Sequence, residues 1–179
     1  VGELYFQCHR GVQTSQSRVK WGNRKSEIAL RETEFMGTLA RLAGHPYPLS
    51  TVDECWKQVL LCQFHDILPG SSIKRVYDEA YATHVGVMDT LSAARREMAA
   101  ALCKGDRGLT VFNSLSFART ALVPLPEDWE GAAFEGSPLP VQELNGALVA
   151  RDCGNLLLIF YEDCKKTVDL ARRYIALEE

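Results

Sequence analysis

A histidine and an aspartate stand side by side at the most chemically suggestive point of the sequence. His65 and Asp66 follow an apolar helical stretch and precede Pro69-Gly70, a pair that makes the chain turn. Both side chains are therefore expected at an edge of the fold. Imidazole is a common zinc ligand, and a neighbouring carboxylate can orient it, act as a further ligand or accept a hydrogen bond from a substrate hydroxyl.

Spacing alone favours a simpler interpretation of this pair. One His-Asp pair at a helix end is more often a capping and hydrogen-bonding arrangement than a metal site, since zinc needs about three or four ligands. The other histidines, His9, His45 and His84, share no spacing with His65. His84 falls in the seam of a predicted helix, where a core or boundary histidine with satisfied hydrogen bonds is expected.

Two predicted helices lie before the pair. The first covers residues 15–43 and ends at Gly44, with an apolar face made of Ile28, Phe35, Leu39 and Leu42. The second begins at Ser50 or Thr51, where Thr51 and Glu54 have the spacing of a capping box, and Pro69-Gly70 stops it.

A third predicted helix begins near Ser71 or Ser72 and is the longest. Its apolar seam alternates steps of four and three residues, the spacing of helices that pack side by side. The short connections predict an antiparallel three-helix bundle. The members of the seam are Ile73, Tyr77, Ala80, His84, Val87, Leu91, Ala94, Met98 and Ala101.

After Cys103 the pattern changes from helical to strand-like. Short strands are predicted at residues 109–112, 120–125, 141–144 and 156–161, with a hairpin turn at Asn145-Gly146 and a helix at residues 164–177. The fold class is therefore α+β, a three-helix bundle followed by the beginning of a β-sandwich-like domain. The expected divisions are residues 1–14, 15–104 and 105–179.

Composition excludes several classes of function. The chain has 179 residues, a net charge of -3 and no dense basic cluster, so nucleic acid is not expected as a partner. Its longest apolar run is far shorter than the ~20 residues of a membrane-spanning helix. The six cysteines lack CxxC spacing, which favours free thiols in a reducing compartment and a cytoplasmic location.

Two motifs in order resemble family 38 glycoside hydrolases, the zinc-dependent retaining α-mannosidases. The sequence from Gly2 to Glu27 is similar to the segment that joins the catalytic barrel of that family to its helical middle domain. Gln63-Phe-His-Asp-Ile-Leu-Pro-Gly-Ser-Ser-Ile73 resembles the family's QxHD signature. The resemblance extends through Val111-Phe-Asn-Ser-Leu-Ser116 and covers residues 2–125, so residues 1–14 are expected to be a strand and loop from the end of the barrel.

The resemblance implies roles for individual residues. His65 would be a zinc ligand, and Asp66 would contact the hydroxyls of a mannose ring. His9 and Arg10 are weaker candidates for lining the same pocket, because an ordinary surface turn before Gly11 explains them equally well. Zinc in such enzymes holds adjacent sugar hydroxyls, a templating and Lewis-acid role.

The resemblance also implies what this chain lacks. Retaining glycoside hydrolysis needs two carboxyl groups about 5–5.5 Å apart. In family 38 these groups and the other zinc ligands come from an upstream barrel that begins with His-x-Asp, and no His-x-Asp occurs here. The chain alone is expected to be inactive towards terminal α-mannosyl residues.

The expected partners are the missing catalytic barrel domain and a mannose-containing oligosaccharide, while a homo-oligomer remains open. A second hypothesis is a non-catalytic helical-bundle interaction module in which His65 and Asp66 only terminate a helix.

Overall fold

The computed structural model describes residues 10–103, 111–115, 121–125, 127, 130, 133–134, 137–139, 141–144, 147–152 and 158–159. The chain divides into two compact units. The first combines Val1–Arg41 with Pro46–Ala99, and the second combines Leu42–His45 with Ala100–Glu179. The first unit is helical and the second contains the strands. The predicted division at residues 14 and 104 is not tested by this grouping and stays a prediction.

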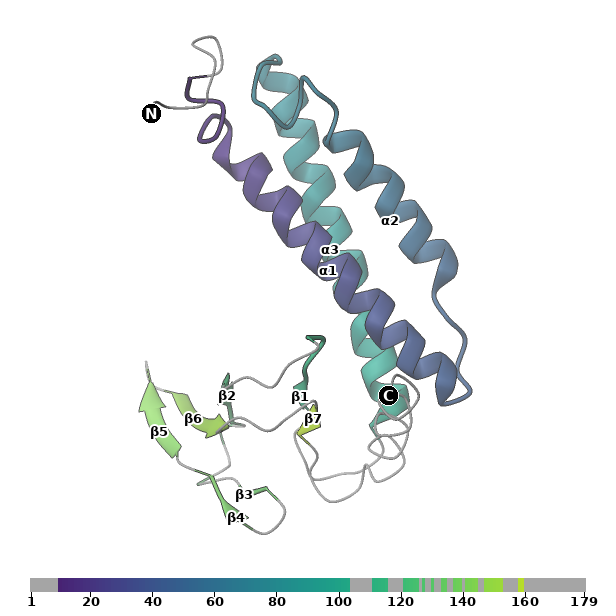
Figure 1. The fold of residues 1–179 in the computed structure, drawn as a ribbon, viewed down its shortest axis with the longest axis vertical. Coiled ribbons are helices and arrows are strands. Elements are labelled where there is room, and N and C mark those ends of the chain that lie inside the picture. The colour runs from purple at the N-terminus through teal and green to yellow at the C-terminus, as the bar shows by residue number, and fades with distance from the viewer. Residues whose placement is uncertain are drawn as a thin grey trace, which may run out of the picture. The chain divides into compact units, whose positions relative to one another are not determined.

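Three helices make up the first part of the chain: α1 (Ser17–Leu42), α2 (Leu49–Cys62) and α3 (Lys74–Leu102). Figure 1 shows α1 and α3 running in the same direction with α2 antiparallel to both, which confirms the predicted helical bundle. The link between α2 and α3 lies at the same end of the bundle as the start of α1. No helix in the described part of the chain is long and apolar enough to cross a membrane.

The centre of the bundle is built from all three helices. The cluster contains Ala29 and Leu30 of α1, Val52, Cys55 and Val59 of α2, and Val87 and Leu91 of α3. Trp56 packs against this cluster, and its indole nitrogen donates to Glu34 Oε1 on α1 at 2.8 Å. On the other side, Arg95 of α3 donates to the Ala29 carbonyl at 2.8 Å. Apolar burial drives the association, and these polar contacts fix the helices against one another.

The predicted apolar face of α1 is only partly correct. Leu39 is buried, but Leu42 is 47% exposed, while Ile28 and Phe35 are half-buried. The buried face instead includes small and polar residues such as Ser26 and Thr33, whose hydroxyls are satisfied within the bundle. A pattern of apolar residues does not predict this part of the buried face, because Ser26 and Thr33 are small, polar and hydrogen-bonded within the bundle.

The seam of α3 is confirmed in its middle. Tyr77, Ala80, His84, Val87, Leu91 and Met98 are all buried. Ile73, predicted as its first member, precedes the helix and is exposed, and Leu102 is buried at the far end where Ala101 was predicted.

The predicted capping box of α2 is wrong. The helix begins at Leu49 directly after Pro48, and no side chain caps it. Pro48 is the N-cap residue, with a non-helical backbone (φ -79°, ψ 55°), and because proline has no N–H group it leaves one donor fewer to satisfy there. Thr51 therefore lies inside the first turn, and Glu54 accepts a hydrogen bond from Lys57 at 2.8 Å.

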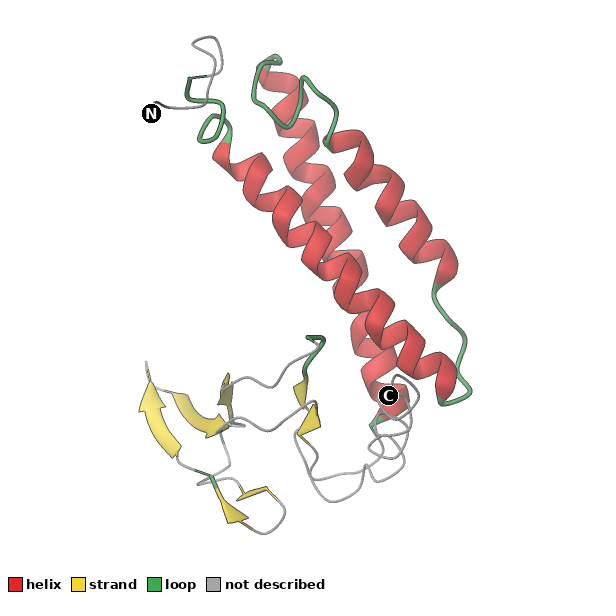
Figure 2. Cartoon of the chain, viewed as in Figure 1, coloured by secondary structure: helices red, strands yellow, loops and turns green. Residues whose placement is uncertain are grey.

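The second unit contains short antiparallel strands, drawn as arrows in Figure 2. β2 and β5 both pair with β6, β1 pairs with β7, and β3 pairs with β4. The strands are β1 (Val111–Phe112), β2 (Ala121–Pro124), β3 (Ala133–Phe134), β4 (Ser137–Pro138), β5 (Val141–Leu144), β6 (Ala147–Asp152) and β7 (Leu158–Ile159).

The predicted strands correspond to β1, β2, β5 and β7 in their described parts. β5 and β6 pair with Leu144 opposite Ala147, the register of the predicted hairpin, although Asn145-Gly146 itself lies outside the described residues. The helix predicted at residues 164–177 also lies outside them. The strands agree with an α+β chain, while the β-sandwich stays a prediction.

Candidate metal and substrate site

The connection between α2 and α3 carries the predicted pair. The prediction that Pro69-Gly70 stops the second helix is wrong, because α2 ends at Cys62, seven residues before Pro69. Since α3 begins at Lys74, His65 and Asp66 stand on an eleven-residue connection (residues 63–73) and not at a helix end. Their side chains are 76% and 58% exposed, and His65 Nε2 lies 3.4 Å from Asp66 Oδ2. The expected position at an edge of the fold is confirmed, since neither side chain is used in the core.

Two neighbours contact the pair directly. The ring of Phe64 lies 4.2 Å from the imidazole of His65 between centroids, tilted by 43°. Ser71 Oγ lies 3.5 Å from Asp66 Oδ1, at the long limit of a hydrogen bond. Despite these contacts, both side chains remain largely exposed to solvent.

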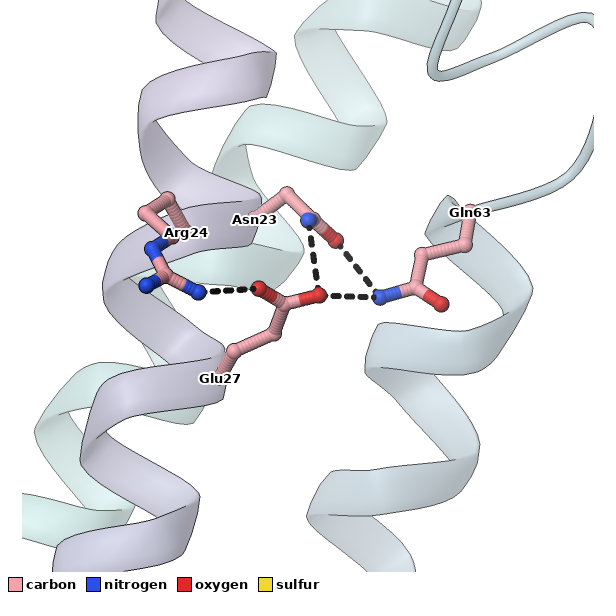
Figure 3. Close-up of polar contacts among 4 residues, drawn as sticks. All are labelled: Asn23, Arg24, Glu27 and Gln63. Atoms are coloured by element: carbon pink, nitrogen blue, oxygen red, sulfur yellow. Dashed lines mark hydrogen bonds and ion pairs between the residues drawn. The ribbon is translucent and has the colours of Figure 1, made fainter.

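The residue before this exposed stretch is tied firmly to α1. Gln63 Nε2 donates to Asn23 Oδ1 at 3.0 Å and to Glu27 Oε1 at 2.9 Å. The Glu27 carboxylate also accepts hydrogen bonds from Asn23 at 3.2 Å and from Arg24 at 3.3 Å, as Figure 3 shows. The end of α2 is thereby joined to the first half of α1 by a neutral hydrogen bond to Asn23 and a charge-assisted one to Glu27.

The residues after the pair are tied to the start of α1. Lys20 Nζ donates to the carbonyls of Leu68 at 2.8 Å and Pro69 at 3.2 Å, and also to the carbonyl of Ser15. An ammonium has three N–H donors, so these carbonyls account for all of them. Burial lowers the pKa of Lys20 from its usual value.

An apolar contact and a glycine complete the connection. Ile67 packs against the cluster of Val19, Cys62, Tyr77 and Ala80. Gly70 adopts φ +96°, and a Cβ there would meet the Ser15 side chain, whose Oγ lies 3.4 Å from the Gly70 carbonyl. This position therefore needs a residue without a side chain.

Of the other candidate residues, Arg10 and His84 are described and His9 is not. His9 lies outside the described residues, and Arg10 is exposed on the turn that leads into α1. His84 is fully buried on α3, as its place in the seam predicted, but the expected satisfied hydrogen bonds are only half present, since Nδ1 meets Ser26 while Nε2 has no partner among the described residues. No group of three or more His, Cys, Asp or Glu side chains placed to hold a metal occurs among the described residues.

Sequence reasoning assigned no role to the residues that hold this connection. Lys20, Asn23 and Glu27 are spaced by three and four residues, which places them on one face of α1. That polar stripe was the available signal. Its partners are backbone carbonyls and one glutamine far along the chain, which no local pattern reveals.

The helical bundle and its exposed His-Asp connection lie within a segment that matches a known protein family. Residues 7–102 match the family described as the alpha mannosidase middle domain. Because the match covers more than half of the chain, the chain belongs to this family, which confirms the resemblance stated from the two motifs.

Relatives that are similar to this chain are named alpha-mannosidases. Alpha-mannosidase G of Dictyostelium discoideum is 47% identical over 88 residues, 49% of this chain and 8% of the relative. Human alpha-mannosidase 2C1 is 35% identical over 132 residues, 71% of this chain and 13% of the relative. The alpha-mannosidase of Saccharomyces cerevisiae is 47% identical over 79 residues, which are 42% of this chain and 7% of the relative. The chain thus matches a small part of each relative's length.

Proposed function

We propose that this chain is the middle-domain part of a zinc-dependent retaining α-mannosidase that removes terminal α-mannosyl residues from oligosaccharides. In this proposal His65 is a zinc ligand and Asp66 contacts sugar hydroxyls. The observation that carries it is the exposure of the two adjacent side chains on a connection fastened on both sides to α1. The membership of the alpha mannosidase middle domain family supports it.

The donors at the connection suit zinc. Two ligands at about 2.0–2.1 Å from a tetrahedral zinc stand about 3.3–3.4 Å apart. His65 Nε2 and Asp66 Oδ2 lie 3.4 Å apart, so a metal held by His65 has the Asp66 carboxylate within reach of itself and of a sugar hydroxyl bound to it. Zinc would supply a template and Lewis acid for adjacent hydroxyls. The described residues offer too few ligands for a complete site, so the others must come from another part of the protein.

The surroundings of the pair fit the catalytic barrel domain as the partner that completes the site. Four large apolar side chains at this end of α2 and in the connection are more than half exposed: Leu60, Leu61, Phe64 and Ile73. Exposed apolar residues gathered around polar groups are typical of a surface that another domain covers. We infer that the barrel packs here and supplies the remaining ligands, with His9 and Arg10 as secondary candidates for the sugar pocket.

Catalysis itself is assigned to residues outside this chain. The nucleophile and the acid/base must be two carboxyl groups about 5–5.5 Å apart, and we assign both to the barrel. The isolated chain, supplied with zinc, is therefore expected to show no mannosidase turnover. The free thiols of Cys55 and Cys62 support a reducing, cytoplasmic compartment. The strands from Val111 onward would begin a larger β-sandwich-like domain.

The experiment compares His65→Ala with the parent in the complete gene product. We expect loss of bound zinc and of mannosidase activity with an unchanged helical circular dichroism spectrum. His45→Ala is the matched control, because His45 stands on the other connection of the bundle, between α1 and α2. A folded His65→Ala protein that keeps its zinc and its activity would overturn the proposal and favour the non-catalytic interaction module.

A further inference from the structure

The connection that carries His65 is fastened at nearly every point except at the pair itself. Gln63 is held before it, while Ile67 is packed and Leu68, Pro69 and Gly70 are held after it. The described side-chain contacts of His65 and Asp66, by contrast, are with Phe64 and Ser71 of the connection itself and not with α1. A free chain of this length would sample many conformations, and holding it in one of them costs conformational entropy.

The contacts on the two sides of the pair come from one face of one helix. Asn23 and Glu27 hold Gln63, and Lys20 holds the two carbonyls that follow Ile67. The main apolar cluster lies further along the helices, and a second buried cluster of Val19, Cys62, Tyr77 and Ala80 packs against Ile67, so the polar contacts act beside apolar packing at this end. A lysine that takes three backbone carbonyls and is partly removed from water does more than solubilise a surface.

We propose that Lys20, Asn23 and Glu27 of α1 are positioning residues for the metal ligand His65, acting through the backbone carbonyls of residues 68–69 and through Gln63. This inference rests on the proposed function of His65. Its physical basis is that a metal site binds tightly when its ligands are already in place, and loss of an outer-shell partner typically weakens metal binding by about 10- to 100-fold.

Lys20→Met is the main test because methionine keeps an unbranched apolar chain and removes all three donors. In the complete gene product we expect the dissociation constant for zinc, measured by competition with a chelator, to rise by about tenfold or more. In the metal-free protein, amide hydrogen exchange of residues 63–72 should become faster. Lys20→Arg, which keeps the charge and several donors, should restore most of the zinc affinity.

Lys57→Met is the matched control, since Lys57 is an exposed lysine of α2 whose described ion pairs are with Asp53 and Glu54 on its own helix. It should leave both measurements unchanged. Gln63→Leu tests the other side of the pair with the same two measurements, and it keeps the inference testable if Lys20→Met does not fold. We expect weaker zinc binding and faster exchange in this variant as well.

The outcomes separate this inference from the proposed function. If His65→Ala loses zinc while Lys20→Met and Gln63→Leu bind zinc as tightly as the parent, the positioning role is wrong and the ligand assignment stands. If His65→Ala keeps its zinc, the ligand assignment is wrong, and with it the positioning of a metal ligand. Faster exchange without weaker zinc binding would reduce these contacts to a purely structural role and overturn the inference.

Discussion

The imidazole of His84 on α3 meets the hydroxyl of Ser26 on α1 in the interior of the bundle, with Nδ1 and Oγ 3.1 Å apart. Both residues are fully buried, and among the described residues His84 Nε2 has no hydrogen-bond partner. Burial lowers the pKa of His84 from its usual value of 6.5. Burial in the folded bundle therefore favours the neutral form of this histidine.

The first prediction concerns the pH dependence of stability. Because the folded state has the lower pKa, the unfolded chain binds a proton first as the pH falls below 6.5. The free energy of unfolding should therefore be greatest above pH 6.5 and decrease below it, by at most about 1.4 kcal/mol per pH unit for one group. Urea unfolding followed by circular dichroism between pH 8 and pH 5 measures this slope.

His84→Gln is the control for that slope, since glutamine retains a polar group that does not titrate. The variant should be less stable at pH 8, yet its stability should decline less between pH 7 and pH 5. Equal slopes in the parent and the variant would mean that other groups cause the acid sensitivity.

The second prediction concerns the close approach of α1 and α3 at Gly22. A Cβ at this position would lie 2.9 Å from His84 Cβ, which is too close for an ordinary contact. Alanine is the better helix former by about 1 kcal/mol, but overpacking a buried contact typically costs about 1–3 kcal/mol. We expect Gly22→Ala to lower the free energy of unfolding or leave it unimproved.

Gly86→Ala on α3 gives the matched comparison. A Cβ at Gly86 meets nothing within 4 Å, so only the gain in helix propensity remains. This variant should be more stable than the parent by about 1 kcal/mol. If both alanine variants stabilise the bundle to the same extent, α1 and α3 do not approach closely at His84.

These contacts indicate what the sequence could and could not predict. The three helices, the buried seam of α3 and the exposed His65-Asp66 turn follow from periodicity and from Pro69-Gly70, which are local signals. The packing of Ser26 against His84 pairs residues 58 positions apart and involves a polar side chain, so an apolar pattern does not reveal it.

The start of α2 was mispredicted for a local reason. Thr51 and Glu54 have the spacing of a capping box, but α2 begins at Leu49 and its N-cap residue is Pro48, three residues before Thr51. The fastening of the connection by Lys20 was not predicted because a lysine that binds backbone carbonyls leaves no signal in the residues it contacts.

The third prediction separates backbone strain from crowding at Gly70. Gly70 and Gly44 have similar positive φ angles, +96° and +91°, but only Gly70 faces another side chain, that of Ser15. An alanine in such a conformation costs about 1–2 kcal/mol. Gly44→Ala should lose about this much stability, and Gly70→Ala should lose more, as measured by urea unfolding of the helices.

The same variants test whether the connection depends on Ser15. Amide exchange of residues 63–72 should become faster in Gly70→Ala and stay unchanged in Gly44→Ala. A Gly70→Ala protein as stable as Gly44→Ala would show that Ser15 moves aside without cost.

The fourth prediction distinguishes Asp66 from His65. If His65 holds zinc and Asp66 holds sugar hydroxyls, Asp66→Asn should keep the metal and lose a charge-assisted hydrogen bond to the substrate. Such bonds contribute about 1.5–3 kcal/mol, so kcat/KM for a mannoside should fall roughly 10- to 100-fold in the complete gene product. Zinc content and kcat/KM are measured on the same preparation.

Asp78→Asn is the control for Asp66→Asn, because Asp78 is an exposed carboxylate of α3 whose described ion pair is with Lys74. It should behave like the parent. Loss of zinc from Asp66→Asn to the extent seen in His65→Ala would make Asp66 a metal ligand, a role that its carboxylate oxygen, 3.4 Å from the imidazole nitrogen, can reach. Unchanged kcat/KM with unchanged zinc would remove Asp66 from the site. His65 would then be the only contribution of this connection, because His65 is the one remaining metal-binding side chain between Gln63 and Ile73.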